Sequence, residues 1–86
     1  MTTRRYVGKQ ILLALAKYRL AGYNPTLGDV EGRLQLPAGT ATGERIRELR
    51  TRDGYRIRCQ RAEDGYWRYS LHLATARRIV RLATAA

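Results

Sequence analysis

The chain has 86 residues, a formal net charge of +10 and a hydrophobic share of 44%. This length fits one small domain, and this hydrophobic share excludes a wholly disordered chain. The single cysteine excludes an internal disulfide, and together with a single histidine it argues against a metal site, so we expect no cofactor.

Arginine dominates the charge of the chain. Seventeen basic residues stand against seven acidic ones, and all of the basic residues except Lys9 and Lys17 are arginine. The planar guanidinium forks onto phosphates and guanine edges better than an ammonium does. The balance therefore predicts an anionic partner: nucleic acid first, then an acidic protein or a membrane surface. The alternative is a GC-rich genome that supplies arginine codons to a merely soluble surface.

The sequence offers no membrane segment. The longest apolar run, "ILLALA" at residues 11–16, is far too short to span a bilayer. Nothing at the start of the chain resembles a signal peptide. We therefore expect a soluble protein of the bacterial cytoplasm or nucleoid, with no membrane partner.

The first third of the chain predicts two helices. Residues 1–6 are expected to form a basic arm, and residues 7–21 a helix that ends at Gly22 before Pro25. The apolar stripe of this helix consists of Ile11, Leu12, Leu15 and Tyr18. Thr26 and Asp29 form a start typical of a capping box. The second helix then carries Leu27, Val30 and Leu34 at helical spacing.

A third helix is predicted from about Thr40 to Arg52, after a break at Pro37 and Gly39. Its inner stripe consists of Thr42, Ile46 and Leu49. On a helical wheel, the outward positions are assigned to Ala41, Glu44, Arg45, Glu48 and Arg52, and Arg47 and Thr51 to the other flank. Alternatively, Thr40 or Thr42 serves only as the N-terminal cap of the helix. Gly54 is available to end it.

Beyond Gly54 the apolar spacing changes to two, which predicts a β-hairpin. "YRIRCQR" at residues 55–61 and "YWRYSLH" at residues 66–72 flank an Asp64-Gly65 turn. The alternation assigns Tyr55, Ile57, Cys59, Trp67, Tyr69 and Leu71 to the inner face. Trp67 and Tyr69 could stack on single-stranded bases, but core packing is favoured. Tyr66 is expected on the opposite, exposed face.

A final helix is predicted over residues 73–86. Its modest apolar face includes Ile79, Val80 and Leu82, which makes it the natural element for a homodimer. The order of three helices, a hairpin and a further helix describes a small α+β winged helix-turn-helix domain at residues 7–72, because an isolated hairpin must pack on helices to be stable.

The stretch "ERIRELRTRDGYRIRCQRAEDGYWRYSL", residues 44–71, carries a more specific signal. It resembles the end of the recognition helix and the wing of the winged-helix domain at the start of biotin operon repressors. It is also similar to winged-helix domains of phage and mobile-element proteins. The matching positions are Leu49, Arg50, Gly54, Tyr55, Ile57, Tyr69 and Leu71. The resemblance implies DNA binding without ligase activity. The chain departs from the family in a longer, glycine-rich turn over residues 35–44.

The predicted DNA-binding residues fall into three groups. Those expected to face base edges are Thr40, Ala41, Glu44, Arg45 and Glu48, with Arg45 as the candidate for a forked contact to guanine. Those expected to meet phosphate are Arg47 and Arg52, and, on the wing, Arg56, Arg58, Arg61 and Arg68. Alternatively, Glu44 and Glu48 pair with arginines one turn away. The wing arginines would then be solvated charges that protect a strand edge.

These features predict sequence-specific binding of double-stranded DNA, typical of a phage or mobile-element transcriptional regulator, such as a repressor, or of an excision factor. One alternative is a module that binds an acidic host protein. Another is binding of single-stranded or structured RNA, which exposure of Tyr66 and Trp67 would favour. An enzyme is not expected, because His72 has no companions for catalysis and "PAGTATGE" lacks the lysine of a Walker sequence.

Overall fold

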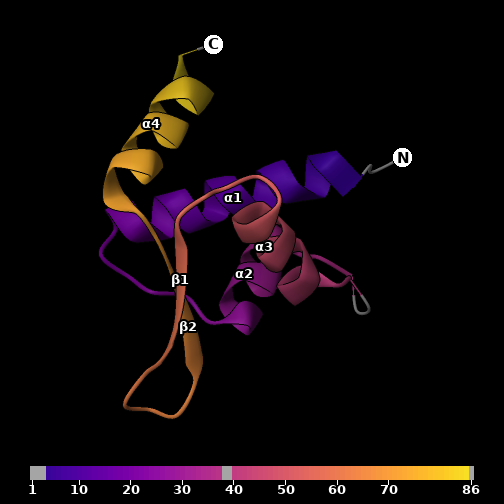
Figure 1. The fold of residues 1–86 in the computed structure, drawn as a ribbon, viewed down its shortest axis with the longest axis vertical. Coiled ribbons are helices and arrows are strands. Elements are labelled where there is room, and N and C mark those ends of the chain that lie inside the picture. The colour runs from indigo at the N-terminus through magenta and orange to yellow at the C-terminus, as the bar shows by residue number, and fades with distance from the viewer. Residues whose placement is uncertain (1–3, 38–39, 86) are drawn as a thin grey trace.

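A computed structural model describes residues 4–37 and 40–85 of the chain. Within these residues the fold is a small α+β arrangement of helices and one antiparallel hairpin (Figure 1). The elements are α1 (Arg4–Leu20), α2 (Leu27–Leu34), α3 (Thr42–Thr51), β1 (Ile57–Arg61), β2 (Trp67–Leu71) and α4 (Leu73–Thr84). The predicted class and order of elements are therefore confirmed.

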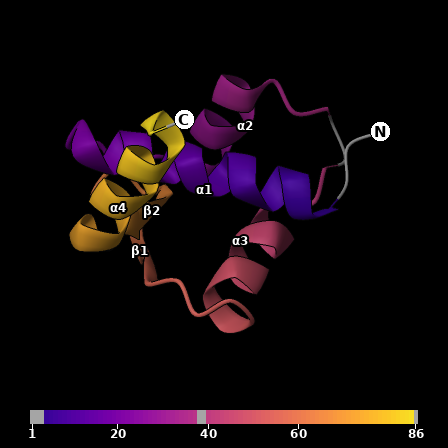
Figure 2. The same cartoon turned by 90° about the horizontal axis from the view of Figure 1, so that it is seen from above.

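Helix α1 forms the centre of the molecule. Seen from above, α2 and α3 lie on opposite sides of α1, while α4 crosses its C-terminal half (Figure 2). Its inward stripe is buried, with Ile11, Leu15 and Ala16 at most 1% exposed. The helix begins at Arg4. Residues 4–6 are therefore helical, whereas the sequence predicted a separate arm; residues 1–3 lie outside the described residues.

The capping box predicted for α2 is confirmed. The Thr26 hydroxyl accepts from the Asp29 backbone N–H at 3.1 Å, and the Asp29 carboxylate accepts from the Thr26 N–H at 3.0 Å. Two N–H groups at the start of the helix thus gain partners within the chain. This cap fixes where α2 leaves the loop after α1, and that loop also supports the hairpin.

Helix α3 buries the predicted stripe of Thr42, Ile46 and Leu49. Its N-cap residue, however, is Ala41, which forms no side-chain cap. The interpretation of Thr40 or Thr42 as the cap is therefore wrong. Thr42 is only 2% exposed, and its hydroxyl donates across to the Glu31 carboxylate at 2.9 Å. The Thr42 side chain points into the core, and from there its hydroxyl joins α3 to α2.

The hairpin has the predicted turn, and its two strands pair antiparallel. Ile57 pairs with Leu71, and both side chains are buried. Farther from the core the same face continues through Tyr69, which is half-buried, to Trp67, which is 58% exposed. The prediction that Tyr69 packs against the core is confirmed, and the same prediction for Trp67 is wrong. The hairpin extends beyond the helices that cover its base (Figure 1), and Trp67 lies beyond the core that Tyr69 contacts.

Helix α4 joins the same core as the rest of the fold. Ala76 is fully buried, and Ile79 and Val80 are partly buried against the core. Leu82 is 66% exposed. No helix in the described part of the chain is long and apolar enough to cross a membrane.

Candidate nucleic-acid interface

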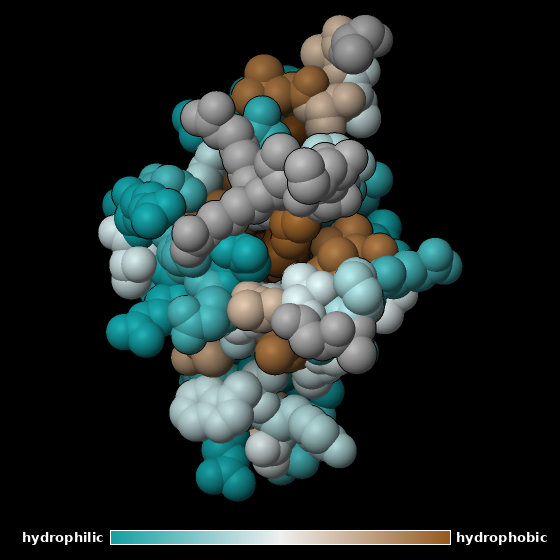
Figure 3. Space-filling view, turned by 90° about the vertical axis from the view of Figure 1, so that its right-hand side faces the viewer, coloured by the Kyte–Doolittle hydropathy of each residue, from teal (hydrophilic) through white to brown (hydrophobic). Residues whose placement is uncertain are grey.

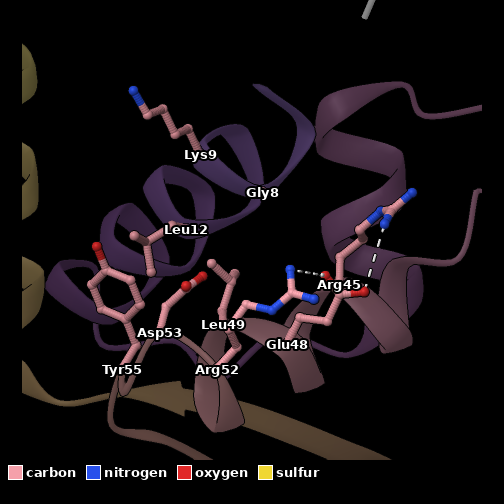
Figure 4. Close-up of a pocket in the computed structure, with 9 residues that line it drawn as sticks. All are labelled: Gly8, Lys9, Leu12, Arg45, Glu48, Leu49, Arg52, Asp53 and Tyr55. Atoms are coloured by element: carbon pink, nitrogen blue, oxygen red, sulfur yellow. Dashed lines mark ion pairs between the residues drawn. The ribbon is translucent and has the colours of Figure 1, made fainter. Parts of the chain in front are cut away.

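One side of α3 faces α1 across a groove. Lys9 and Leu12 of α1 line the groove together with Arg45 and Glu48 of α3 (Figure 4). The Glu48 carboxylate lies 3.7 Å from the guanidinium of Arg45 and 3.9 Å from that of Arg52. The acid thus bridges two arginines, each about one turn away from it along the helix. Such partly exposed pairs contribute at most about 1 kcal/mol each, so they orient these side chains more than they stabilise the helix.

The predicted outward placement of Arg45 and Glu48 is therefore wrong. Arg45 follows Thr42 by three positions and precedes Leu49 by four, so on a helical wheel it lies only about 60° and 40° from two buried residues. Its side chain is 26% exposed, and its Nε atom is buried without a hydrogen-bond partner among the described residues. Arg45 belongs to the flank of the inner stripe. Pairing of Glu48 with arginine, the alternative interpretation, is confirmed.

The outward face of α3 carries a different set of side chains. Glu44, Arg47, Arg50 and Thr51 are exposed. The Thr51 hydroxyl donates back to the Arg47 carbonyl at 2.8 Å, and Arg47 is exposed to solvent. No described residue forms an ion pair with Arg47 or Arg50. These arginines, and not Arg45, are the cations that α3 presents outward.

Arg50 lies on the side of α3 that faces the hairpin. Burial raises the pKa of Tyr69, the neighbouring Cys59 raises it further, and the positive charge of Arg50 opposes the shift. Arg50 is thus close enough to β2 for its charge to act there. Arg50 was not among the predicted DNA-binding residues. The sequence feature that could have identified Arg50 is its position on the helical wheel, on the flank opposite Arg45. That flank faces the next element of the chain.

Thr40 and Ala41 lie at the N-terminal end of α3, beside its outward face. Ala41 is exposed, and its carbonyl accepts the Arg45 N–H at 3.0 Å. Thr40 is half-buried, and its carbonyl accepts the Thr42 N–H at 2.7 Å. Both predicted residues thus contribute chiefly backbone groups to the entry of the helix.

The hairpin exposes Arg58 near its base and Arg61 near its outer end. Both line a shallow hollow with Gln60, Ser70 and Asn24. By the strand register Arg61 lies opposite Trp67, and Arg58 lies opposite Ser70. Arg58 therefore shares no hollow with Arg45, because the two side chains face separate depressions of the surface. The cation that α3 contributes beside the hairpin is Arg50.

Arg68, predicted to meet phosphate, is occupied within the protein. Its guanidinium donates to the Asn24 carbonyl at 2.8 Å, to the Tyr23 hydroxyl at 3.2 Å and to the Asp64 carboxylate. It also lies 3.9 Å from Asp29 and over the Tyr23 ring. Arg68 therefore ties the hairpin turn to the loop between α1 and α2, and its fork is not directed to solvent.

The pKa values of two acids in this network, Asp29 and Asp64, are lowered by their hydrogen bonds. The Thr26 backbone N–H and the Tyr23 hydroxyl hold the pKa of Asp29 below its usual value, with a smaller contribution from Arg68. The hydrogen bond from Arg68 likewise lowers the pKa of Asp64. Both carboxylates thus stay ionised at neutral pH and keep Arg68 in place.

Arg56 lies in a second hollow, between the loop after α3 and α4. Its other basic lining residues are His72, Arg78 and Arg81. This hollow shares Asp53 and Tyr55 with the groove between α1 and α3. The two hollows adjoin at these residues and are here together called the basic trough, whose basic residues are Lys9, Arg45, Arg52, Arg56, His72, Arg78 and Arg81.

The surface seen from the right of Figure 1 is mainly hydrophilic, with apolar residues gathered at its middle and near the α4 end (Figure 3). Within residues 4–37 and 40–85, no group of three or more histidine, cysteine, aspartate or glutamate side chains is arranged to hold a metal ion. Comparisons with protein-family models, curated proteins and solved structures found no match to this chain.

Proposed function

We propose that this chain is a winged helix-turn-helix protein that binds double-stranded DNA with sequence specificity. The order of elements supports this proposal, since two helices connected through residues 35–41 are followed by a hairpin. In such domains the second helix of the pair lies in the major groove, and a hairpin can meet phosphates or the neighbouring minor groove. Helix α3, with 10 residues, is about 15 Å long, enough to lie across the groove.

One observation carries the proposal: solvent-directed arginines lie on α3 and on the adjacent hairpin. Arg47 and Arg50 belong to α3, and Arg58 and Arg61 belong to the hairpin. None of these four has an ion-pair partner among the described residues, whereas Arg45, Arg52 and Arg68 do. The acids thus neutralise other cations and leave these four arginines for phosphate.

Base recognition falls on the outward face of α3. Arg47 takes the role first assigned to Arg45, a forked contact to guanine. Glu44, three residues before it, is exposed and can accept from a cytosine amino group. Arg50, Arg58 and Arg61 supply contacts to phosphate that do not depend on sequence.

The biological setting follows from the resemblance to winged-helix proteins of phages and mobile elements. We propose a transcriptional regulator or excision factor of the bacterial cytoplasm that binds paired half-sites about one helical turn apart as a dimer. The alternative partner, an acidic protein, gains no support from Glu48, because that acid is paired with Arg45 and Arg52. Arg68 is not included in the proposed interface.

Selection of binding sites from random duplexes, followed by anisotropy titrations, tests the proposal. We expect a shared motif, and Arg47→Ala should weaken binding to it by about 1–3 kcal/mol. Arg58→Ala should weaken binding to all duplexes alike. Neutralisation of five phosphates gives a slope of log affinity against log salt near −4.5.

Arg77→Ala is the matched control. It removes the same charge from an exposed position of α4, outside the proposed surface and outside the basic trough. Binding that shows no salt dependence, or that loses as much in Arg77→Ala as in Arg47→Ala, would contradict the proposal.

A further inference from the structure

Two adjacent aromatic side chains stand exposed at the outer end of the hairpin. Tyr66 is 64% exposed and Trp67 is 58% exposed. Large aromatic residues are normally buried because they carry much apolar surface. Neither ring is needed for the described core, which ends on this face with Leu71 and the half-buried Tyr69. Packing within the protein therefore does not explain these two exposed rings, and contact with another molecule would.

The rings lie on opposite faces of the ribbon. Successive side chains of an extended strand alternate between faces, so Trp67 shares the face of Tyr69 and Tyr66 shares that of Arg68. The backbone pairing continues to this point, since the Tyr66 carbonyl accepts the Ala62 N–H at 2.9 Å. The tip of the hairpin is thus a thin two-stranded edge with one aromatic ring on each side.

The tip is also held in a fixed conformation. Gly65 supplies a φ of +85°, and the Asp64 carboxylate accepts the Tyr66 N–H at 3.1 Å. Arg68 joins Asp64 to the loop between α1 and α2, and the Tyr69 N–H donates to the Pro25 carbonyl at 2.9 Å. A tip anchored in this way presents its rings without a large loss of conformational entropy on binding.

The charges around the rings favour an anionic ligand with flat apolar surfaces. Arg61 lies opposite Trp67 in the strand register, and Arg58 is exposed two pairs nearer the core than Gln60. Glu63 is the exposed acid at the turn whose charge opposes them, because Asp64 is paired with Arg68. Unpaired nucleotides combine a phosphate with a base that can stack on an aromatic ring.

We propose that Trp67 and Tyr66 stack on unpaired bases where duplex DNA opens into single strands. This inference rests on the proposed function, since α3 would hold the duplex while the hairpin tip meets the opened end. With one ring on each face, the tip can take one base on either side. The chain would therefore prefer a duplex with a single-stranded tail to the same duplex with blunt ends.

The first test uses Trp67 as its own reporter, because it is the only tryptophan in the chain. The probes are a blunt 20-base-pair duplex, the same duplex with a ten-nucleotide thymine tail at one end, and a free 20-mer of thymine. We expect the tailed duplex and the free strand to quench Trp67 emission, with little quenching by the blunt duplex. Unchanged emission with every probe would overturn the inference.

The second test measures affinity by anisotropy of labelled DNA. Stacking of one base contributes enough for the tail to raise affinity roughly 5- to 100-fold. Trp67→Ala should remove most of this gain and change binding of the blunt duplex less than about twofold. Trp67→Phe keeps a ring and should retain much of the gain. A gain that survives Trp67→Ala would also overturn the inference.

The two proposals fail in distinguishable ways. Arg47→Ala should weaken blunt and tailed duplexes by the same factor, so that the gain from the tail persists. If blunt duplexes bind in the expected salt-dependent manner but the tail adds nothing, the stacking inference alone is wrong. If blunt duplexes do not bind at all, the proposed function is wrong. Melting of each variant confirms that it folds, since both rings are exposed and their removal should leave stability nearly unchanged.

Discussion

Gln35 ends α2 with φ 53° and ψ 41°, a left-handed conformation that non-glycine residues rarely adopt. Its N–H donates to the Gly32 carbonyl at 3.3 Å, and the Leu36 N–H donates to the Glu31 carbonyl at 3.1 Å. These bonds satisfy the last carbonyls of the helix in the way a glycine at this position usually does. A side chain with a Cβ atom therefore holds a position that favours glycine.

Gln35→Gly should stabilise the protein by about 1 kcal/mol, because it relieves the cost of a left-handed non-glycine residue. Urea unfolding followed by circular dichroism measures the change. Gln35→Ala is the control, since it removes the same side-chain groups but keeps the Cβ atom, and it should give no comparable gain. Equal stabilisation by both variants would show that the backbone conformation is not the cause.

At the level of individual residues, contacts between residues close together in the sequence could be predicted, and contacts between residues farther apart could not. The Thr26–Asp29 capping box could be identified because both partners lie within one turn of each other. The roles of Arg68 and Thr42 could not. Their partners, Tyr23 and Asn24 for Arg68 and Glu31 for Thr42, come from distant parts of the sequence and meet only after the elements pack.

The helices and strands were predicted in type and order. Which flank of each helix is covered, and how far along each strand the core extends, were not predicted. The stripe of Ile46 and Leu49 identified the buried side of α3, yet residues on its flank, such as Arg45, depend on which neighbour lies beside them. Alternation likewise identified the inner face of β2 without showing where the core ends. The length of β2 that the core covers is set by α1, and it leaves Trp67 exposed.

The hydrogen bond between Thr42 and Glu31 links α2 to α3 and so fixes how α3 is presented. Thr42→Val preserves the shape of the side chain but removes the donor. It should cost about 1–2 kcal/mol, since the half-buried Glu31 carboxylate loses its partner. Thermal unfolding measures the loss, and Thr42→Ser, which keeps the hydroxyl, is the control.

A double-mutant cycle with Glu31→Ala isolates this contact. In the Glu31→Ala background Thr42→Val should cost clearly less, because the bond is already absent. Equal costs in both backgrounds would mean that the hydroxyl acts through the Thr40 carbonyl, its weaker partner at 3.4 Å.

Across the whole molecule, the net charge of +10 was the most direct prediction from composition, but its distribution needed the structure. Three of the acids, Asp29, Glu48 and Asp64, pair with Arg45, Arg52 and Arg68. Composition cannot show which arginines are paired, because pairing depends on which side chains the helices and the hairpin bring together. Unpaired arginines lie on the outward face of α3, on the hairpin and along the basic trough, and also outside these surfaces, as Arg77 does.

The basic trough gives a last prediction, which concerns DNA beyond the reach of α3. Because the trough begins at the flank of α3 and ends at α4, we expect it to receive phosphates that flank the bound site. Arg78→Ala combined with Arg81→Ala should then reduce the magnitude of the salt slope by about 1.8, at about 0.9 for each lost phosphate contact. The ratio of affinities between selected and random duplexes should stay the same, since phosphate contacts carry no sequence information. Arg77→Ala, on the same helix but outside the trough, should leave the slope unchanged. A slope that does not respond to the double variant would restrict the interface to α3 and the hairpin, because counterions would still be released only there.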